Sequence, residues 1–180
     1  MTSINTPYAT LSFVNAFTPR PRAESGEPVY SCALIFDPTQ QKSPAYKALQ
    51  EACVAAARKE FGNNVSLTHV IMPFRDAGDK TYEGYRKGDT YVSPWSKNKP
   101  GIVDARRQDI LLPEEVWSGQ LARANVTPFA WAHSGRKGVS LGLNHLQIIE
   151  STGRQRLDGR PTAGSAFDDG EVNAKDDEPF

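Results

Sequence analysis

The sequence predicts a mainly β protein with one α-helix, folded as a small, partly open β-barrel with long loops. Two patterns support this fold: apolar residues alternate over several stretches of strand length, and a single stretch, 44–61, has helical spacing. A third feature lies outside the barrel. Residues 168–180 hold six acids and one base, with too little apolar surface to fold, so we expect a disordered acidic tail.

The composition describes one polar, soluble domain. The chain has 180 residues, of which 38% are hydrophobic, and no apolar run is long enough to span a membrane. The N-terminus lacks the basic and apolar regions of a signal peptide. Cys32 and Cys53 lie in apolar surroundings, which is typical of buried, reduced thiols. We therefore expect a cytoplasmic protein that does not contact membranes.

Two strands and a loop open the chain. Residues 8–17 alternate, with Leu11 and Phe13 on the same face, which predicts a half-buried strand. Residues 18–28 contain three prolines, a glycine and two exposed arginines, and are expected to form a loop. Residues 29–36 are apolar on both faces, as a central buried strand is.

The helix has clear ends. Ser43 can cap it, Pro44 suits the first helical position, and Gly62 suits the position after the last turn. Its alanine-rich interior would let it pack closely against a sheet, and we expect no chemistry on it. Its apolar face consists of Tyr46, Leu49, Cys53, Ala56, Ala57 and Phe61.

The second half of the chain predicts short strands at 90–96 and 101–105, a helical turn at 113–117 and a long final hairpin. In the first strand of the hairpin, 119–133, one face is small, whereas the other carries Arg123, Phe129 and Trp131. In the return strand, 138–150, the apolar parity switches near Asn144, which predicts a β-bulge. Five to seven strands and one helix fit a five-stranded OB-fold-like barrel best.

No catalytic motif of the common hydrolases or nucleotide-binding enzymes occurs in the sequence. The three histidines show no metal-ligand spacing, so we expect neither a metal nor a cofactor. Scattered aspartates around residues 76–109 leave a Mg²⁺-dependent nuclease as an alternative. Aspartates in glycine-rich segments more often bond to nearby backbone N–H groups in turns.

Aromatic residues interleaved with basic residues predict a surface for unpaired nucleic acid. Unpaired bases stack on aromatic rings, and lysine and arginine neutralise the phosphates between them. For Trp131 a place in the core is an equally good interpretation. The candidate binding residues are Arg75, Lys80, Tyr82, Tyr85, Arg86, Lys87, Tyr91, Trp95, Lys97, Lys99, Arg106, Arg107, Phe129, Trp131, Arg136 and Lys137.

Charge is divided between the body and the tail. The formal net charge is zero, but the body carries 20 bases and 15 acids, and the tail carries the remaining six acids and one base. This asymmetry indicates an anionic partner for the body. The tail closes with Asp176, Asp177, Glu178, Pro179 and Phe180, a combination that suits docking to a partner protein.

Four segments of the sequence carry a resemblance to a known family. The tip 176–180 is similar to the tip of bacterial single-stranded DNA-binding proteins, although the body is not. Residues 88–93, 122–131 and 137–147 resemble the single-stranded DNA-binding proteins of tailed bacteriophages. That resemblance implies an OB-fold in residues 1–150, a flexible linker and acidic tail in 151–180, and a tail that regulates DNA binding and recruits partners.

The function expected from these observations is non-enzymatic binding of single-stranded DNA, with little sequence preference, during phage replication, recombination and repair in the host cytoplasm. The tail would compete with DNA for the basic body and recruit replication proteins such as a polymerase, helicase or primase. A homodimer or cooperative assembly on DNA is possible. The alternatives are an RNA-binding or cold-shock-like protein, the nuclease, and a virion or scaffold protein.

Overall fold

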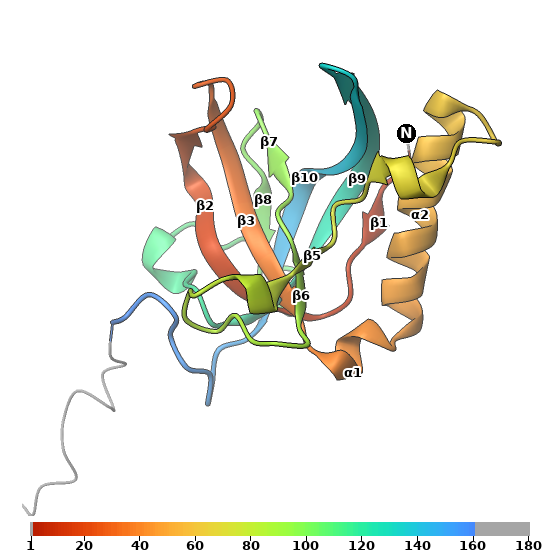
Figure 1. The fold of residues 1–180 in the computed structure, drawn as a ribbon. Helices are drawn as coiled ribbons and strands as arrows, with labels where there is room; N and C mark the ends of the chain where they lie inside the picture. The colour runs from red at the N-terminus through yellow and green to blue at the C-terminus, as the bar shows by residue number, and fades with distance from the viewer. Residues whose placement is uncertain (1, 161–180) are drawn as a thin grey trace, which may run out of the picture.

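The computed structural model describes residues 2–160, which form one sheet of ten strands with a helix at its side (Figure 1). The strands are β1 (Ile4–Asn5), β2 (Ala9–Pro21), β3 (Pro28–Phe36), β4 (Val70–Ile71), β5 (Arg75–Asp76), β6 (Thr90–Val92), β7 (Trp95–Ser96), β8 (Gly101–Val103), β9 (Leu121–His133) and β10 (Arg136–Glu150). The helices are α1 (Pro38–Gln41) and α2 (Pro44–Phe61), and 3₁₀ turns occur at Leu67–His69, Ala77–Asp79 and Pro113–Glu115.

Five strands pair in a closed circuit, in which the last strand pairs again with the first. β2 pairs with β3, β3 with β7, β7 with β10, β10 with β9, and β9 with β2. All of these pairs are antiparallel except β7–β10, which is the pairing of an OB-fold barrel. The barrel is only partly closed, because β7 and β10 share one residue pair and β2 and β9 share two.

The structure divides the expected five strands into ten. The third position of the barrel is occupied in turn by β6, β7 and β8, each of two or three residues. Prolines at 94 and 100 interrupt pairing between these pieces, since proline has no N–H to donate. The sequence predicted strands at 90–96 and 101–105, so the gap between β7 and β8 was expected but the break between β6 and β7 was not. The short strands β1, β4 and β5 have no pattern of their own.

The inward face of β9 is small and completely buried. Ala122, Ala124 and Val126 are at most 1% exposed and belong to the main core cluster. On β10 the register shifts between Leu143 and His145, which confirms the predicted bulge and keeps Leu146 in the core. The alternate residues of both strands face outward, as the sequence pattern predicted.

Helix α2 begins and ends where its sequence predicts. The Ser43 hydroxyl accepts a hydrogen bond from the Tyr46 backbone N–H at 3.2 Å, and Gly62 follows the helix at φ 96°. Its buried face packs against β9, β10 and β1 (Figure 1). Cys53 from this face and Cys32 from β3 are buried free thiols, and burial raises the pKa of each to about 12. The short helix α1 was not predicted.

Strand β2 departs from its predicted alternation. The register to β3 shifts between Ser12 and Asn15, so Phe13 lies on the outside at 50% exposure instead of beside Leu11 in the core. Phe13 adopts a φ of 45°, and the Asn15 side chain donates to the Phe13 carbonyl at 3.4 Å. The extra residue of this β-bulge turns the ring outward, which an alternation pattern cannot reveal.

The predicted loop 18–28 is shorter than expected. Pairing continues to Pro21 opposite Pro28, at the turn end of the β2–β3 hairpin, where proline is tolerated. The tips of this hairpin and of the β9–β10 hairpin lie at the same end of the molecule, with β7 between them (Figure 1).

Residues 151–160 are not a free linker. The Arg154 guanidinium donates to the Gly119 carbonyl at 2.9 Å and to the Thr10 hydroxyl at 2.7 Å, and the Leu157 N–H donates to the Ser118 carbonyl. Leu157 also packs on a second cluster of buried residues, which consists of Ile35, Ala77, Tyr85 and Tyr91. The packed part of the chain therefore extends at least to Leu157. Residues 161–180, with the predicted tail, lie outside the described residues.

We predict that Gly119→Ala detaches this segment. A Cβ at Gly119 would lie 1.9 Å from the Gln155 carbonyl oxygen, and the glycine has a φ of 115° that alanine disfavours. Trypsin should then cleave after Arg154 and Arg156 faster than in the parent protein. Gly153→Ala is the matched control, because its φ of 73° is also positive but its Cβ would meet nothing within 4 Å. Equal cleavage of the two variants would contradict this role of the segment.

Candidate nucleic-acid interface

The candidate interface lies on the outer face of β3 and its neighbours. Ser31 and Ile35 share this face, since residues of the same parity on a strand point the same way. Trp95 is paired with Ser31, and Tyr91 is paired with Ile35. The two aromatic residues therefore stand four residues apart along one face, about 13 Å at the usual rise of a strand.

At one end of this face, Trp95 forms the centre of an aromatic and basic group. Its ring meets the Phe129 ring edge-to-face, with centroids 5.9 Å apart. The guanidinium carbon of Arg22 lies 4.0 Å from the centroid of the Trp95 ring. Arg22 comes from the β2–β3 hairpin tip, so three separate parts of the chain meet here. Trp95 and Phe129 remain half-buried, which leaves part of each residue accessible.

Trp131 lies on the same outer face and covers Gly138. The two residues are paired across β9 and β10, and a Cβ on Gly138 would come within 2.3 Å of the indole ring. Because glycine has no side chain, the indole ring can lie directly against the strand here, and such a contact stabilises glycine in a sheet. Trp131 is half-buried on the outside of the barrel and is not part of the main core cluster.

Two predicted stacking residues are buried. Tyr85 and Tyr91 are 9% and 7% exposed and pack with Ile35 and Ala77 in the second core cluster. Burial raises the pKa of Tyr85, and a hydrogen bond to Ser12 offsets part of that shift. These rings cannot stack on a base in this conformation, so we correct the prediction for both: Tyr85 from the 77–89 loop packs on Tyr91 of β6, with centroids 5.1 Å apart. The sequence missed this because the loop has few apolar residues of its own.

Tyr82 is the member of this tyrosine group that stays accessible, at 50% exposure. Its ring meets Phe13 edge-to-face at 4.9 Å and Tyr85 at 5.4 Å. The loop that carries it is closed by a hydrogen bond from the Ala77 N–H to the Asp89 carbonyl. The loop crosses in front of β2 and β3 (Figure 1).

All ten predicted basic residues are exposed: Arg75, Lys80, Arg86, Lys87, Lys97, Lys99, Arg106, Arg107, Arg136 and Lys137. Within residues 2–160, only Lys97 of these ten forms an ion pair, with Glu27 at 2.9 Å. That pair is itself more than half exposed and contributes little to stability, so a phosphate can replace the carboxylate at small cost.

The basic residues do not all share one place. Lys99 lies 5.5 Å from the Phe17 ring, and Lys137 lies 5.2 Å from the Phe61 ring at the end of α2. Arg107 lines a separate hollow of about 250 Å³ with Arg123 and His145. The structure therefore connects Trp95, Phe129 and Arg22 by direct contact, whereas Lys99, Lys137 and Arg107 each lie beside other groups.

Two aspartates of the alternative nuclease site, Asp76 and Asp104, serve in turns. Asp76 accepts from the Gly78 N–H at 2.8 Å, and Asp104 accepts from the N–H groups of Arg106 and Gln108. In the described part of the chain, no three His, Cys, Asp or Glu side chains are grouped so that they could hold a metal ion. None of the helices in residues 2–160 is long and apolar enough to cross a membrane.

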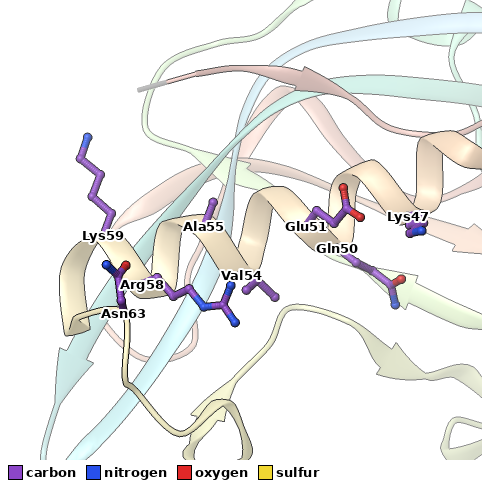
Figure 2. Close-up of a pocket in the computed structure, with 8 residues that line it drawn as sticks. All are labelled: Lys47, Gln50, Glu51, Val54, Ala55, Arg58, Lys59 and Asn63. Atoms are coloured by element: carbon purple, nitrogen blue, oxygen red, sulfur yellow. The ribbon is translucent and has the colours of Figure 1, made fainter.

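Helix α2 provides a surface for comparison. Its outward side bears a shallow depression with bases and an acid but no aromatic ring (Figure 2). The lining side chains come from Lys47, Gln50, Glu51, Val54, Ala55, Arg58, Lys59 and Asn63. Charge without stacking surface makes this face a poor candidate for unpaired bases, and it supplies basic residues for control experiments.

Sequence reasoning missed two residues of the interface. Arg22 was recognised only as an exposed base, although its position in the first hairpin of an OB-fold-like barrel was a usable signal. Phe13 was assigned to the core face, and only the bulge in β2 places it outside.

The family model described as Enterobacter phage Enc34, ssDNA-binding protein, matches residues 2–179. The chain belongs to this family. The resemblance to phage single-stranded DNA-binding proteins is thereby confirmed, and the family is not one of enzymes. No curated protein sequence matches the chain.

Solved structures agree with this assignment. The single-stranded DNA-binding protein from bacteriophage Enc34 in complex with ssDNA superposes with a TM-score of 0.69 at 16% identity, covering 84% of this chain and 88% of that one. A second Enc34 structure gives 0.68 at 15%, covering 92% and 90%. The gp2.5 single-stranded DNA-binding protein of bacteriophage T7 gives 0.56 at 16%, covering 83% and 92%.

We predict that Gly138→Ala displaces the Trp131 ring. The new methyl group has no room beneath the indole, and overpacking of this kind costs about 1–3 kcal/mol of stability. The indole N–H resonance of Trp131 should shift and the unfolding midpoint should fall. Gly135→Ala in the adjacent turn is the control for the Trp131 resonance, since its Cβ would meet nothing within 4 Å; its φ of 76° disfavours alanine, so the two midpoints are not compared. An unchanged Trp131 resonance would show that the ring does not lie on Gly138.

Proposed function

We propose that this protein binds single-stranded DNA, without reading its sequence, through the outer face that carries Trp95, Phe129 and Arg22. The observation that carries the proposal is the contact between these three residues, which come from β7, β9 and the β2–β3 hairpin. Membership of the Enc34 family supports it. The protein would cover exposed strands during phage replication, recombination and repair.

The chemistry of the group suits unpaired bases. Stacking of a base on an aromatic ring contributes about 1–3 kcal/mol and does not depend on which base is present. Arg22 covers part of Trp95 in the free protein, so an incoming base either displaces the guanidinium or stacks on its plane. Exposed lysine and arginine side chains then neutralise phosphates of the strand. This adds affinity that falls as the salt concentration rises.

A duplex fits this surface poorly, because its bases are already stacked and paired and offer only edges in the grooves. RNA remains the second nucleic acid to test, since stacking and phosphate contacts alone do not exclude a 2′-hydroxyl. A nuclease is disfavoured by the turn roles of Asp76 and Asp104.

We predict that Trp95→Ala weakens binding to an oligothymidylate by about 5- to 150-fold, the loss of one stacked base. Tryptophan fluorescence titration with oligothymidylate, and with duplex DNA of equal length, measures it. The control is Trp117→Phe, because Trp117 packs beside Arg156 and the Arg154–Arg160 segment. Equal affinity of Trp95→Ala and the parent protein, or preference of the parent for duplex, would contradict the proposal.

The same titration at several salt concentrations separates phosphate contacts from bulk charge. Each phosphate contact to a single strand contributes about 0.7 to the slope of log affinity against log salt. Lys99→Ala should lower that slope by about this amount. Arg58→Ala on the outward side of α2 removes the same charge and should leave the slope unchanged (Figure 2).

We further propose that the acidic tail competes with DNA and that its last residues, Asp176–Phe180, bind replication proteins such as a polymerase, helicase or primase. Opposite charges support this: residues 2–160 hold 20 bases and 15 acids, and residues 168–180 hold six acids and one base. The segment that leads to the tail is held in place by Leu157, which lies beside Gly84 and packs on the second core cluster with Tyr85 and Tyr91. A tethered anion near a basic surface competes at high effective concentration. The proposed location is the host cytoplasm. The proposed assembly on DNA is a dimer or a cooperative array.

Deletion of residues 168–180 is predicted to tighten binding to oligothymidylate, most of all at low salt where charge competition is strongest. Replacing the six acids of this segment by their amides, at full length, controls for the loss of chain itself. Pull-down of host or phage replication proteins with and without Phe180 tests the second role. Unchanged affinity at low salt for both the deletion and the amide variant would exclude competition.

A further inference from the structure

We propose that Phe13 and Tyr82 form a second stacking site for an unpaired nucleobase, separate from Trp95 and on the same outer face. This inference rests on the proposed function, because it assigns a further part of the same single strand. The pair consists of two half-exposed aromatic residues in edge-to-face contact, with centroids 4.9 Å apart and planes at 79°.

The conformation of Phe13 is the first argument. A φ of 45° is uncommon for any residue with a Cβ and unfavourable for a bulky one. Ordinary alternation would bury this phenylalanine beside Leu11, where it would stabilise the core. The chain instead holds a large apolar ring at 50% exposure in a strained backbone conformation. Its aromatic contacts with Tyr82 and Tyr85 leave half of the residue exposed.

The support beneath the pair is the second argument. Neighbouring Ser12 stays buried at 3% exposure. Tyr85 packs against Tyr91, with centroids 5.1 Å apart. Leu157 closes the cluster from the other side, against Gly84. Phe13 and Tyr82 are therefore held on a packed base, and a ligand does not have to order them.

The place of the pair is the third argument. Phe13 contacts Tyr82 and Tyr85, and Tyr85 packs with Tyr91 at the Ile35 end of β3, whereas Trp95 lies at the Ser31 end. Tyr91 and Trp95 stand about 13 Å apart along this face, which corresponds to no more than about four nucleotides at the stacked spacing of about 3.4 Å, and the Phe13–Tyr82 pair adjoins Tyr91 through Tyr85. One strand can reach both sites along β3. Basic residues available for its phosphates are Arg75, which is paired with Tyr91 across β5 and β6, and exposed Lys80 and Arg86 near Tyr82 in sequence.

The test uses Phe13→Asn and Tyr82→Ala in the full chain. Asparagine tolerates positive φ, so Phe13→Asn removes the ring and keeps the backbone conformation. We expect its unfolding midpoint to be equal to or above that of the parent protein, while affinity for an oligothymidylate of about 16 nucleotides falls about 5- to 150-fold. A residue of purely structural value would lose stability instead. Leu111→Asn, at a site 78% exposed, controls for loss of exposed apolar surface.

A second readout locates the contact. An oligonucleotide with photoreactive halogenated uracils should crosslink to peptides that contain Phe13 or Tyr82, and Trp95→Ala should leave those crosslinks in place. If both Phe13→Asn and Tyr82→Ala bind within about twofold of the parent while Trp95→Ala does not, the second site is wrong and the proposed function stands. If the parent protein binds no single strand, both fail. Should Phe13→Asn not fold, Tyr82→Ala and the crosslinks decide.

Discussion

The small interior of the barrel is the constraint on which the rest of the structure depends. The inward face of β9 has room only for alanine, valine and proline, so the large side chains of that strand must face outward. Arg123, Phe129 and Trp131 are therefore placed outside by the packing of the core and not by any ligand. Burial of small residues on one face and display of aromatic residues on the other are two results of the same alternation. This explains how a stable fold can hold aromatic rings at its surface.

The long elements of the fold were predictable, because each carries a period that its own residues define. The caps of α2 at Ser43 and Gly62, the two-sided burial of β3 and the bulge of β10 near Asn144 all appear in the structure as the sequence predicted. The pieces β6, β7 and β8 are too short for a period to show. Their pairing depends on β3 and β10, which lie far away in the chain.

The candidate site was harder to predict than the fold, because exposure depends on tertiary contacts. Tyr82 and Tyr85 are three residues apart in a polar loop, and nothing local distinguishes them. Tyr85 is buried because Ile35, Ala77 and Leu157 surround it, whereas Tyr82 stays outside. Phe13 was misassigned for the opposite reason, since its sequence pattern was clear but a bulge held by Asn15 overrode it. Charge was more reliable, because a lysine or arginine stays at the surface in nearly every fold.

The packing of residues 151–160 determines where the chain can be shortened. Arg154 bridges Thr10 and Gly119, Arg156 covers Trp117, and Leu157 completes the tyrosine cluster. A protein that stops at residue 150 would lose all of these contacts together with the tail, and any change in its DNA binding would mix two causes. A boundary after residue 160 keeps the barrel and its outer face intact, so only that boundary separates what the acidic segment does from what the folded domain does.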